Sequence, residues 1–265
     1  MFCGYGFMYN WNDDLDIVRL AVKNAGSIAM RYFLRSPNIC WKNGGSSPVS
    51  DADIAVNAYL ESFLRPLRPS YGWLSEEMDD DFDRLNFKTI FIVDPIDGTR
   101  GFIQGKKEWC ISVAIVHNGR PVIGVIYASA LEKEFVVSIG NQSTCNEEKI
   151  SIALPEEKKC LMIMANDVFL QGLDTVSFKK IPFISSLCLR LCMVASGMID
   201  ILIVNQNAND WDLAAADLLI EGAGGILVGI DGKSLTYNRS QVSHGVLFAS
   251  SKYNFKKFKN YLSSI

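Results

Sequence analysis

An apolar strand that runs directly into two carboxylates is the feature that most restricts this chain. The segment 91–102, FIVDPIDGTRGF, places Asp94 and Asp97 three residues apart. Pro95 stiffens the bend, and Gly98 removes a side chain that would block a ligand. Both carboxylates therefore converge on one point, where without a cation they would repel each other and one would take up a proton. The pattern predicts a divalent cation, and Mg²⁺ prefers carboxylate, carbonyl and water oxygens.

Other groups in the same turn offer further contacts. The Ile96 carbonyl, between the two acids, is a candidate metal ligand. The amides of Gly98 and Thr99 are expected to form a cradle for an anion beside the metal. A turn closed by Asx hydrogen bonds is the alternative interpretation of Asp94 and Asp97.

Acidic residues recur at the ends of two other expected elements. Glu76 and Glu77 follow the short strand YGWL, and Asp212 stands in the first turn of a helix, at the favourable end of the helix dipole. Taken singly, the glutamates suit a solvated pair and Asp212 a helix cap. Their joint occurrence in one chain favours a shared metal site. The acidic run 78–83 is expected to be a solvated loop.

Charge and cysteine usage exclude several classes of protein. The net charge of −3 gives no reason to expect a nucleic acid polymer or an anionic membrane surface as partner. The most apolar stretch is interrupted by Arg190 and Asp200, and the N-terminus lacks the basic start of a signal peptide.

Seven dispersed cysteines without a CxxC pair indicate reduced thiols and a cytoplasmic location. Cys188 and Cys192, one helical turn apart, fit core packing better than half a zinc site.

Hydrophobic periodicity divides the chain into two halves of different type. The first is expected to be α+β, with a helix over 13–35, a loop at 42–50, a helix from Asp51 that ends before Pro66, and then strands with antiparallel pairing. An Asn-Gly pair after His117 predicts a hairpin between two of these strands. The second half alternates strands and helices, which is typical of an α/β layer.

The polar segment 141–149 is the candidate boundary between these halves. We therefore predict an N-terminal α+β domain over residues 1–145, which carries most of the metal ligands. A C-terminal α/β domain over residues 146–265 is expected to contribute Asp212 and contacts to a substrate. A chain of 265 residues is long enough for two domains of this size.

Five segments, in this order, resemble the inositol monophosphatase family of Mg²⁺-dependent, lithium-sensitive phosphomonoesterases. They are SSPVSDAD (46–53), Glu76-Glu77, DPIDGT (94–99), WDLAAAD (211–217) and EGAGG (221–225). The resemblance spans nearly the whole chain, and DPIDGT together with WD before a small-residue helix is its most specific part. It implies a layered αβαβα sandwich, the inositol monophosphatase or sugar phosphatase fold, which is usually a homodimer.

The resemblance also implies a cluster of two to three Mg²⁺ ions. Glu76, Asp94 and the Ile96 carbonyl would hold the first ion. Asp94, Asp97 and Asp212 would hold the second, and Glu76 would help to position a weaker third.

Catalytic roles follow from the same resemblance. Thr99, paired with Asp53, would orient and deprotonate the attacking water. Glu76 would act by holding the metals, and Glu77 would support the metal ligands without binding a metal itself. Two metals would activate the water and stabilise the leaving oxygen of an in-line displacement. The residues expected to contact substrate are Gly98, Thr99, Asp97, Asn205 and Asp212.

The substrate is less determined than the reaction. Members of the family act on inositol monophosphates, 3′(2′)-phosphoadenosine 5′-phosphate, fructose 1,6-bisphosphate or histidinol phosphate. Inositol monophosphatases carry a glutamate before WD that holds sugar hydroxyls, whereas this chain has VNQ at 204–206, which leaves Asn205 or Asn207 to bind hydroxyls. The segment SLCLRLCMVASG resembles the bacterial branch assigned to 3′(2′),5′-bisphosphate nucleotidases. In that branch Arg190 or Lys42 would meet a second phosphate, and solvated side chains are the alternative.

We therefore expect a phosphoric monoester hydrolase that acts on a small phosphorylated metabolite. An inositol monophosphatase-type activity comes first, followed by a bisphosphate nucleotidase and a histidinol-phosphate phosphatase. A haloacid-dehalogenase phosphatase is disfavoured because two residues, rather than one, separate Asp94 and Asp97. A metal-dependent phospholigand sensor is the non-catalytic alternative. His117 and His244 are expected at the surface, without a catalytic role.

Overall fold

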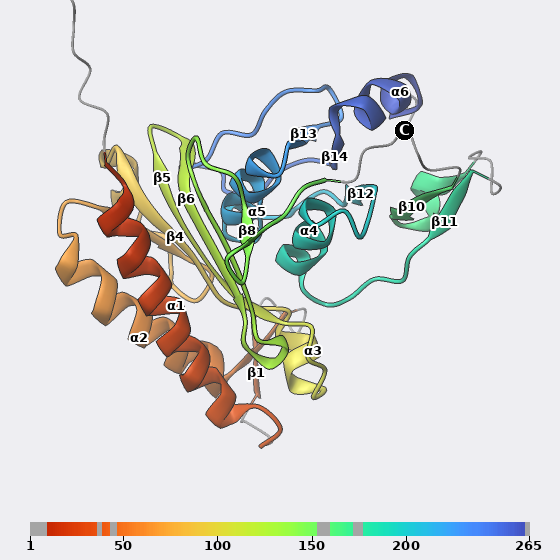
Figure 1. Cartoon of the computed structure of the whole chain (residues 1–265). Coiled ribbons are helices and arrows are strands. Elements are labelled where there is room, and N and C mark those ends of the chain that lie inside the picture. The colour runs from red at the N-terminus through yellow and green to blue at the C-terminus, as the bar shows by residue number, and fades with distance from the viewer. Residues whose placement is uncertain (1–9, 36–38, 43–46, 153–159, 172–176, 263–265) are drawn as a thin grey trace, which may run out of the picture.

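The computed structural model describes residues 10–35, 39–42, 47–152, 160–171 and 177–262, which build five layers (Figure 1). Two helices cover one face of a first sheet, two further helices lie between that sheet and a second one, and a last helix packs on the second sheet. The predicted layered αβαβα sandwich is thus confirmed. In this order the helices are α1 (Asn12–Tyr32), α2 (Asp51–Leu67), α4 (Leu187–Ala195), α5 (Asp210–Gly222) and α6 (Lys252–Leu262).

The first sheet has the strand order β3-β4-β5-β6-β7-β8-β9 among the described residues. Strand β3 runs parallel to β4, and the remaining pairs are antiparallel, including the predicted hairpin between β5 and β6. Its strands are β3 (Gly72–Ser75), β4 (Thr89–Asp97), β5 (Cys110–His117), β6 (Arg120–Ala128), β7 (Lys133–Ser138), β8 (Thr144–Cys145) and β9 (Glu148–Lys149).

The second sheet has the order β11-β10-β12-β14-β13 in the part of the chain that the structure describes. Strand β10 is parallel to β11 and β12, whereas β14 is antiparallel to β12 and β13. Its strands are β10 (Leu161–Met164), β11 (Phe178–Lys180), β12 (Ile201–Val204), β13 (Gly225–Gly229) and β14 (Leu247–Ser251). A short helix, α3 (Thr99–Ile103), follows β4 directly.

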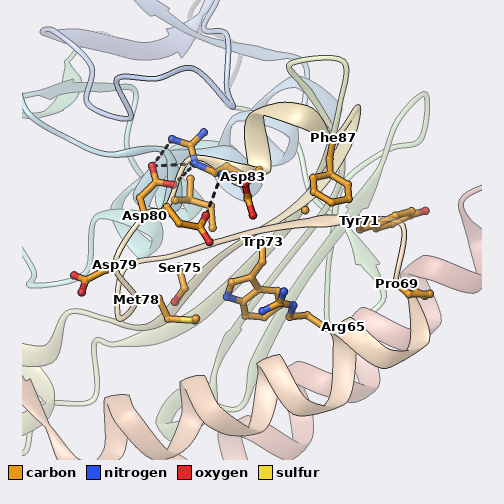
Figure 2. Close-up of a pocket in the computed structure, with 14 residues that line it drawn as sticks. Arg65, Pro69, Tyr71, Trp73, Ser75, Met78, Asp79, Asp80, Asp83 and Phe87 are labelled. Carbon is orange, nitrogen blue, oxygen red and sulfur yellow. Dashed lines mark hydrogen bonds and ion pairs between the residues drawn. The ribbon is translucent and has the colours of Figure 1, made fainter.

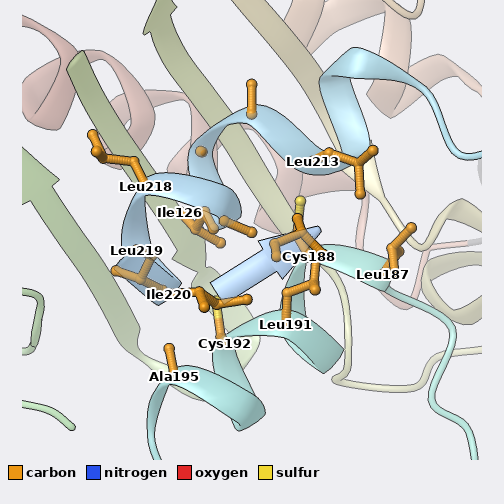
Figure 3. Close-up of a cluster of buried hydrophobic side chains, with 14 of the residues drawn as sticks. Ile126, Leu187, Cys188, Leu191, Cys192, Ala195, Leu213, Leu218, Leu219 and Ile220 are labelled. Carbon is orange, nitrogen blue, oxygen red and sulfur yellow. The ribbon is translucent and has the colours of Figure 1, made fainter. Parts of the chain in front are cut away.

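Helix α5 lies between the two sheets because small residues let it approach β6 closely. Its Ala215 is buried, and a Cβ atom added to Gly124 of β6 would lie 2.6 Å from the Ala215 carbonyl oxygen. Figure 3 shows Leu213 and Ile220 of α5 in one apolar cluster with Leu191 of α4. This packing fixes the direction of α5 and hence the position of its first turn.

Helix α2 extends further than the sequence predicts. It continues through Pro66 to Leu67 instead of ending before the proline. A proline in the last turn removes only one backbone hydrogen bond, and the buried side chains of Leu60 and Leu64 hold this end of the helix in the core. Local sequence rules therefore placed the end of the helix too early.

The predicted loop at 42–50 is also partly wrong. Residues Ser47–Ser50 form β2, which pairs antiparallel with β1 (Ile39–Lys42). Residues 43–46 of that loop lie outside the described residues, as does the side chain of Lys42. The strands of the first sheet end at Lys149 and those of the second begin at Leu161, and the division at 145/146 stays a prediction.

Candidate metal centre and active site

Strand β4 delivers Asp94 and Asp97 into the interior of the protein. The pairing of β4 with β5 is irregular between these two residues, so the strand bends where the sequence predicts a turn. Asp94 is 1% exposed, and neither carboxylate oxygen has a hydrogen-bond partner among the described residues. Burial, with the charges of Glu76, Asp97 and Asp212, raises the pKa of Asp94 well above its usual range. A buried carboxylate without a donor is costly, and a cation would satisfy it.

Helix α5 brings Asp212 to the same place. Its Oδ2 atom accepts a hydrogen bond of 2.7 Å from the Asn209 amide, within a capping box at the start of α5. One oxygen each from Asp94, Asp97 and Asp212 lies within 4.8 Å of the other two. Burial and the charge of Asp97 raise the pKa of Asp212 to about 7. The helix-cap interpretation and the metal-site interpretation of Asp212 are therefore compatible.

Glu76 follows β3, the parallel neighbour of β4, and its amide donates to the Val93 carbonyl at 3.2 Å. Burial, followed by the charges of Asp212, Glu77, Asp97 and Asp53, raises the pKa of Glu76 to about 8. The acidic side chains that follow β3, end β4 and begin α5 thus gather around the buried Asp94. Such a donor set of hard oxygens fits a divalent cation.

Thr99 and Asp53 form a hydrogen-bonded pair beside the carboxylates. The Thr99 hydroxyl lies 2.9 Å from Asp53 Oδ1 and 2.9 Å from the Ile96 carbonyl oxygen, and its single hydrogen can go to only one of them at a time. Asp53 caps α2 by accepting hydrogen bonds from the Ser50 amide at 2.8 Å and the Ser50 hydroxyl at 2.6 Å. Burial raises the pKa of Asp53 to about 6, although these hydrogen bonds oppose the shift.

The N-terminus of α4 packs against the turn and satisfies Asp97. The Asp97 carboxylate accepts hydrogen bonds from the Ser186 hydroxyl at 2.6 Å, the Cys188 amide at 2.5 Å and the Leu187 amide at 3.1 Å. Gly98 has a φ of +95°, and a Cβ atom there would lie 3.0 Å from the Ser186 nitrogen. Sequence reasoning missed Ser186, although a serine before an apolar helix is an N-cap signal.

The residues expected on the substrate side lie in different surroundings. Arg190 of α4 is half-buried, its Nε atom donates to the Ser186 carbonyl at 3.2 Å, and its guanidinium lies 5.2 Å from the centre of the Phe183 ring. Burial lowers the pKa of Arg190, while the negative charges of Asp97 and Asp212 oppose the shift. It is not the fully solvated residue of the alternative interpretation.

Asn205 lies at the end of β12 and is exposed. Its side-chain oxygen accepts a hydrogen bond of 3.0 Å from Asn166, which follows the parallel strand β10. Asn207 is also exposed and has a positive φ of 73°. No contact that the structure gives for the described residues joins these side chains to the carboxylates, so their role as substrate ligands stays a prediction.

The expectation that His244 lies at the surface is wrong. Its side chain is 7% exposed, and Nε2 lies 2.7 Å from Oδ1 of the buried Asp210. Two backbone hydrogen bonds of 2.8 Å join His244 to Asn207 and Ala208, so its burial depends on a distant segment. His117 is half-buried, with Nδ1 2.8 Å from the Thr89 hydroxyl. A surface interpretation of both histidines underestimated long-range packing.

A separate pocket of about 180 Å³ lies at the edge strand β3, beside the acidic run. Figure 2 shows the residues that line it. Asp79 and Asp81 are exposed there, as predicted for a solvated loop. Asp80 is different, because its carboxylate pairs with Arg84 at 2.6 Å, and the Arg84 side chain is 1% exposed. Asp80 therefore has a cationic partner within the chain.

Comparison with known proteins decides the family. The model of the inositol monophosphatase family matches residues 11–262. The chain belongs to the inositol monophosphatase family. The 3′(2′),5′-bisphosphate nucleotidase CysQ of Escherichia coli is 29% identical over 231 residues, covering 84% of this chain and 93% of that protein. The fructose-1,6-bisphosphatase/inositol-1-monophosphatase of Thermotoga maritima is 27% identical over 228 residues, covering 83% and 86%.

Solved structures agree with the family fold. An IMPase of Thermotoga maritima superposes with a TM-score of 0.82 at 23% identity, covering 95% of this chain and 97% of that one. An inositol monophosphatase from Anabaena gives a TM-score of 0.77 at 22% identity, covering 97% and 98%. The inositol monophosphatase family consists of phosphoric monoester hydrolases, and this chain is an enzyme of that class. No helix in the described part of the chain is long and apolar enough to cross a membrane.

Proposed function

We propose that this enzyme hydrolyses a small-molecule phosphomonoester with the help of two to three Mg²⁺ ions. The observation that carries the proposal is the buried, unpartnered carboxylate of Asp94 between Asp97 and Asp212, with the Thr99–Asp53 pair alongside. Glu76, Asp94 and the Ile96 carbonyl would hold one ion, and Asp94, Asp97 and Asp212 another. Bound Mg²⁺ supplies charge stabilisation for the phosphoryl and leaving oxygens and lowers the pKa of the attacking water.

The protein's own groups orient the water and move its proton. The Thr99 hydroxyl, fixed between Asp53 and the Ile96 carbonyl, accepts a hydrogen bond from the water. As the water oxygen bonds to phosphorus and the ester P–O bond breaks, one proton passes through the Thr99 hydroxyl to Asp53. The leaving alkoxide takes a proton from solvent. The amides of Gly98 and Thr99 bind the phosphate oxygens, as expected for successive amides in a turn.

A bisphosphate nucleotidase is the second candidate function. Arg190 supports it, because a half-buried guanidinium whose pKa is influenced by Asp97 and Asp212 suits a second phosphate of the substrate. The absence of a glutamate at 204–206 also weakens the inositol assignment. Relatives named CysQ act as 3′(2′),5′-bisphosphate nucleotidases, and others are named inositol monophosphatase. Histidinol phosphate is a third substrate to test.

One substrate panel tests these alternatives. Purified protein with Mg²⁺ is given inositol 1-phosphate, 3′-phosphoadenosine 5′-phosphate, histidinol phosphate and fructose 1,6-bisphosphate, and kcat/KM is compared. A preference of about a hundredfold or more for one substrate identifies the activity. Binding of all four without release of phosphate would contradict the enzymatic proposal and favour a phospholigand sensor.

Three further properties belong to the proposal. We expect inhibition by Li⁺, because the site is built for small hard cations, and phosphate release measured at rising LiCl tests it. We expect a homodimer, which light scattering tests by molar mass. We expect a cytoplasmic location, because a reducing compartment suits free thiols, and fractionation of cells tests this. The free cysteines among the described residues are Cys110, Cys145, Cys160, Cys188 and Cys192.

A further inference from the structure

Two thiols lie directly behind Asp97, on elements far apart in the sequence. Cys110 begins β5, and Cys188 stands in the first turn of α4. Both sulfurs and one Asp97 oxygen lie within 4.8 Å of one another, and all three residues are buried. The Cys110 sulfur is 3.9 Å from Asp97 Oδ2. Sequence reasoning considered Cys188 only with Cys192 and favoured core packing for both, whereas the thiol that joins the Asp97 group comes from β5.

The separation between the Cys110 sulfur and the Asp97 carboxylate suits a tetrahedral ion that binds sulfur. Metal–sulfur and metal–oxygen bonds of about 2.3 and 2.1 Å at a tetrahedral angle put sulfur and oxygen about 3.6 Å apart. The observed 3.9 Å between Cys110 Sγ and Asp97 Oδ2 requires an adjustment of only a few tenths of an ångström. The Ser186 hydroxyl, 3.4 Å from the Cys110 sulfur, is a further oxygen at this place.

The thiol group is separate from the carboxylate group but shares one member with it. Among the described residues, two clusters have the donor atoms to hold a metal: one of Asp94, Asp97 and Asp212, the other of Asp97, Cys110 and Cys188. Mg²⁺ prefers oxygen donors, whereas thiolates select zinc and similar soft ions. An ion on the two sulfurs would therefore draw Asp97 away from the oxygen-lined centre.

We propose that Asp97, Cys110 and Cys188 form a second metal site, specific for a thiophilic divalent cation such as Zn²⁺ or Cd²⁺, whose occupation inhibits the enzyme. Two S–H bonds break and two sulfur–metal bonds form, and both protons leave to solvent, so no oxidant or reductant is needed. The proposal adds an inhibitory ion of different chemistry to the proposed Mg²⁺-dependent function. Its binding is measurable whether or not the chain turns over a phosphomonoester.

The test is a titration with Cd²⁺ in saturating Mg²⁺, followed by the ultraviolet cadmium–thiolate absorption. The starting chain carries serine in place of Cys3, Cys40, Cys145 and Cys160, so that only Cys110, Cys188 and Cys192 remain. We expect an absorption that saturates at one Cd²⁺ per chain. It should be lost in Cys110→Ala and in Cys188→Ala and retained in Cys192→Ala, the matched control from the same helix. Circular dichroism checks the fold, and if Cys188→Ala does not fold, Cys110→Val, a strand residue of similar size, carries the test.

A second readout links this site to turnover. In the starting chain, micromolar Cd²⁺ should inhibit phosphate release, and a chelator should reverse the inhibition. In Cys110→Ala the half-inhibiting Cd²⁺ concentration should rise at least about tenfold. An absent cadmium–thiolate absorption, or one that survives both replacements, would overturn the proposal. Absorption without any turnover in Mg²⁺ would instead leave the thiol site standing and contradict the proposed function.

Discussion

In two acidic regions of the sequence, 78–83 and 94–97, the pKa values of the buried or half-buried carboxyl groups Asp80 and Asp94 are shifted in opposite directions. In the run beside β3, hydrogen bonds from Arg84 lower the pKa of Asp80 below its usual range, although burial opposes them (Figure 2). In the centre at the end of β4, Asp94 has no donor, and its pKa is raised well above its usual range. The difference shows that the number of acidic residues in a segment does not by itself indicate a metal site. Asp80, whose cationic partner Arg84 lies within the chain, serves structure, whereas the buried Asp94, which has no partner among the described residues, suits a cation from outside.

The largest effect is expected from removing the unpartnered charge. Asp94→Asn should lower kcat by at least ~10³-fold with every substrate, because a neutral amide cannot hold the cation that stabilises the transition-state charge. Phosphate release by purified protein at saturating Mg²⁺ measures this. The matched control is Asp80→Asn, which removes a charge from the paired region and should change kcat by less than about twofold. An Asp94→Asn enzyme with a tenth or more of normal activity would break the comparison.

The next effect concerns the proton acceptor. Thr99→Ala and Asp53→Asn should each lower kcat by ~10²–10⁴-fold, the usual contribution of a positioned general base. The pKa of Asp53 is raised to about 6, so the carboxylate is protonated and inactive below that value and active above it. The normal enzyme should therefore lose activity as pH falls through about 6. Because asparagine does not titrate, a pH–rate profile of Asp53→Asn that keeps the same acidic limb would exclude Asp53 as the base.

Arg190 sharpens the comparison, because it is a cation whose pKa is influenced by Asp97 and Asp212 and for which no ion pair with them is described. Arg190→Ala should lower kcat/KM for 3′-phosphoadenosine 5′-phosphate by ~10–100-fold, the equivalent of one charge-assisted contact. The value for inositol 1-phosphate, which has one phosphate, should stay within about threefold. Arg120→Ala, which removes an arginine paired with Glu221, is the control and should alter neither. Equal losses for both substrates would show that Arg190 supports the fold or the centre rather than a second phosphate.

The smallest effect is on the pH dependence of stability. The folded-state pKa values of Glu76 and Asp212 are raised to about 8 and about 7, so the folded protein binds more protons than the unfolded chain between roughly pH 4 and 8. Without Mg²⁺ the protein should therefore lose stability as pH rises through this window. Because Mg²⁺ binds the ionised carboxylates, it should raise the melting temperature by several degrees more at pH 8 than at pH 6. A change of about 1 kcal/mol in the free energy of unfolding corresponds to ~2–4 °C. Calorimetry with and without Mg²⁺ measures the difference, and an equal increment at both pH values would contradict it.

What the sequence predicted depends on how far apart the interacting residues are. The turn at Asp94 and Asp97 was predictable because adjacent residues fix its geometry. The pairing of Asp80 with Arg84 also has a local signal, the four-residue spacing of opposite charges, although we expected only solvated acids there. Ser186 gives no indication that Asp97, 89 positions earlier, accepts its hydrogen bond.

Long-range packing explains the remaining errors. His244 is buried because its backbone pairs with residues 207–208, a contact that no local pattern reveals. Cys110 and Cys188 meet only because α4 packs against β5. Sequence reasoning therefore predicted the family fold and the acidic turn, but not which residues from other elements surround that turn. We expect those surrounding residues to supply the contacts that distinguish one substrate from another, which is why the reaction is better defined than the substrate.

The central claim is that a cation binds where the buried Asp94 carboxylate lacks partners, between Asp97 and Asp212. Anomalous diffraction from crystals soaked in Mn²⁺, a spectroscopically visible substitute for Mg²⁺ with the same preference for oxygen ligands, tests it most directly. The account predicts a peak at bonding distance from Asp94, Asp97 and Asp212. A peak only beside Asp79–Asp83, or none at the end of β4, would contradict it.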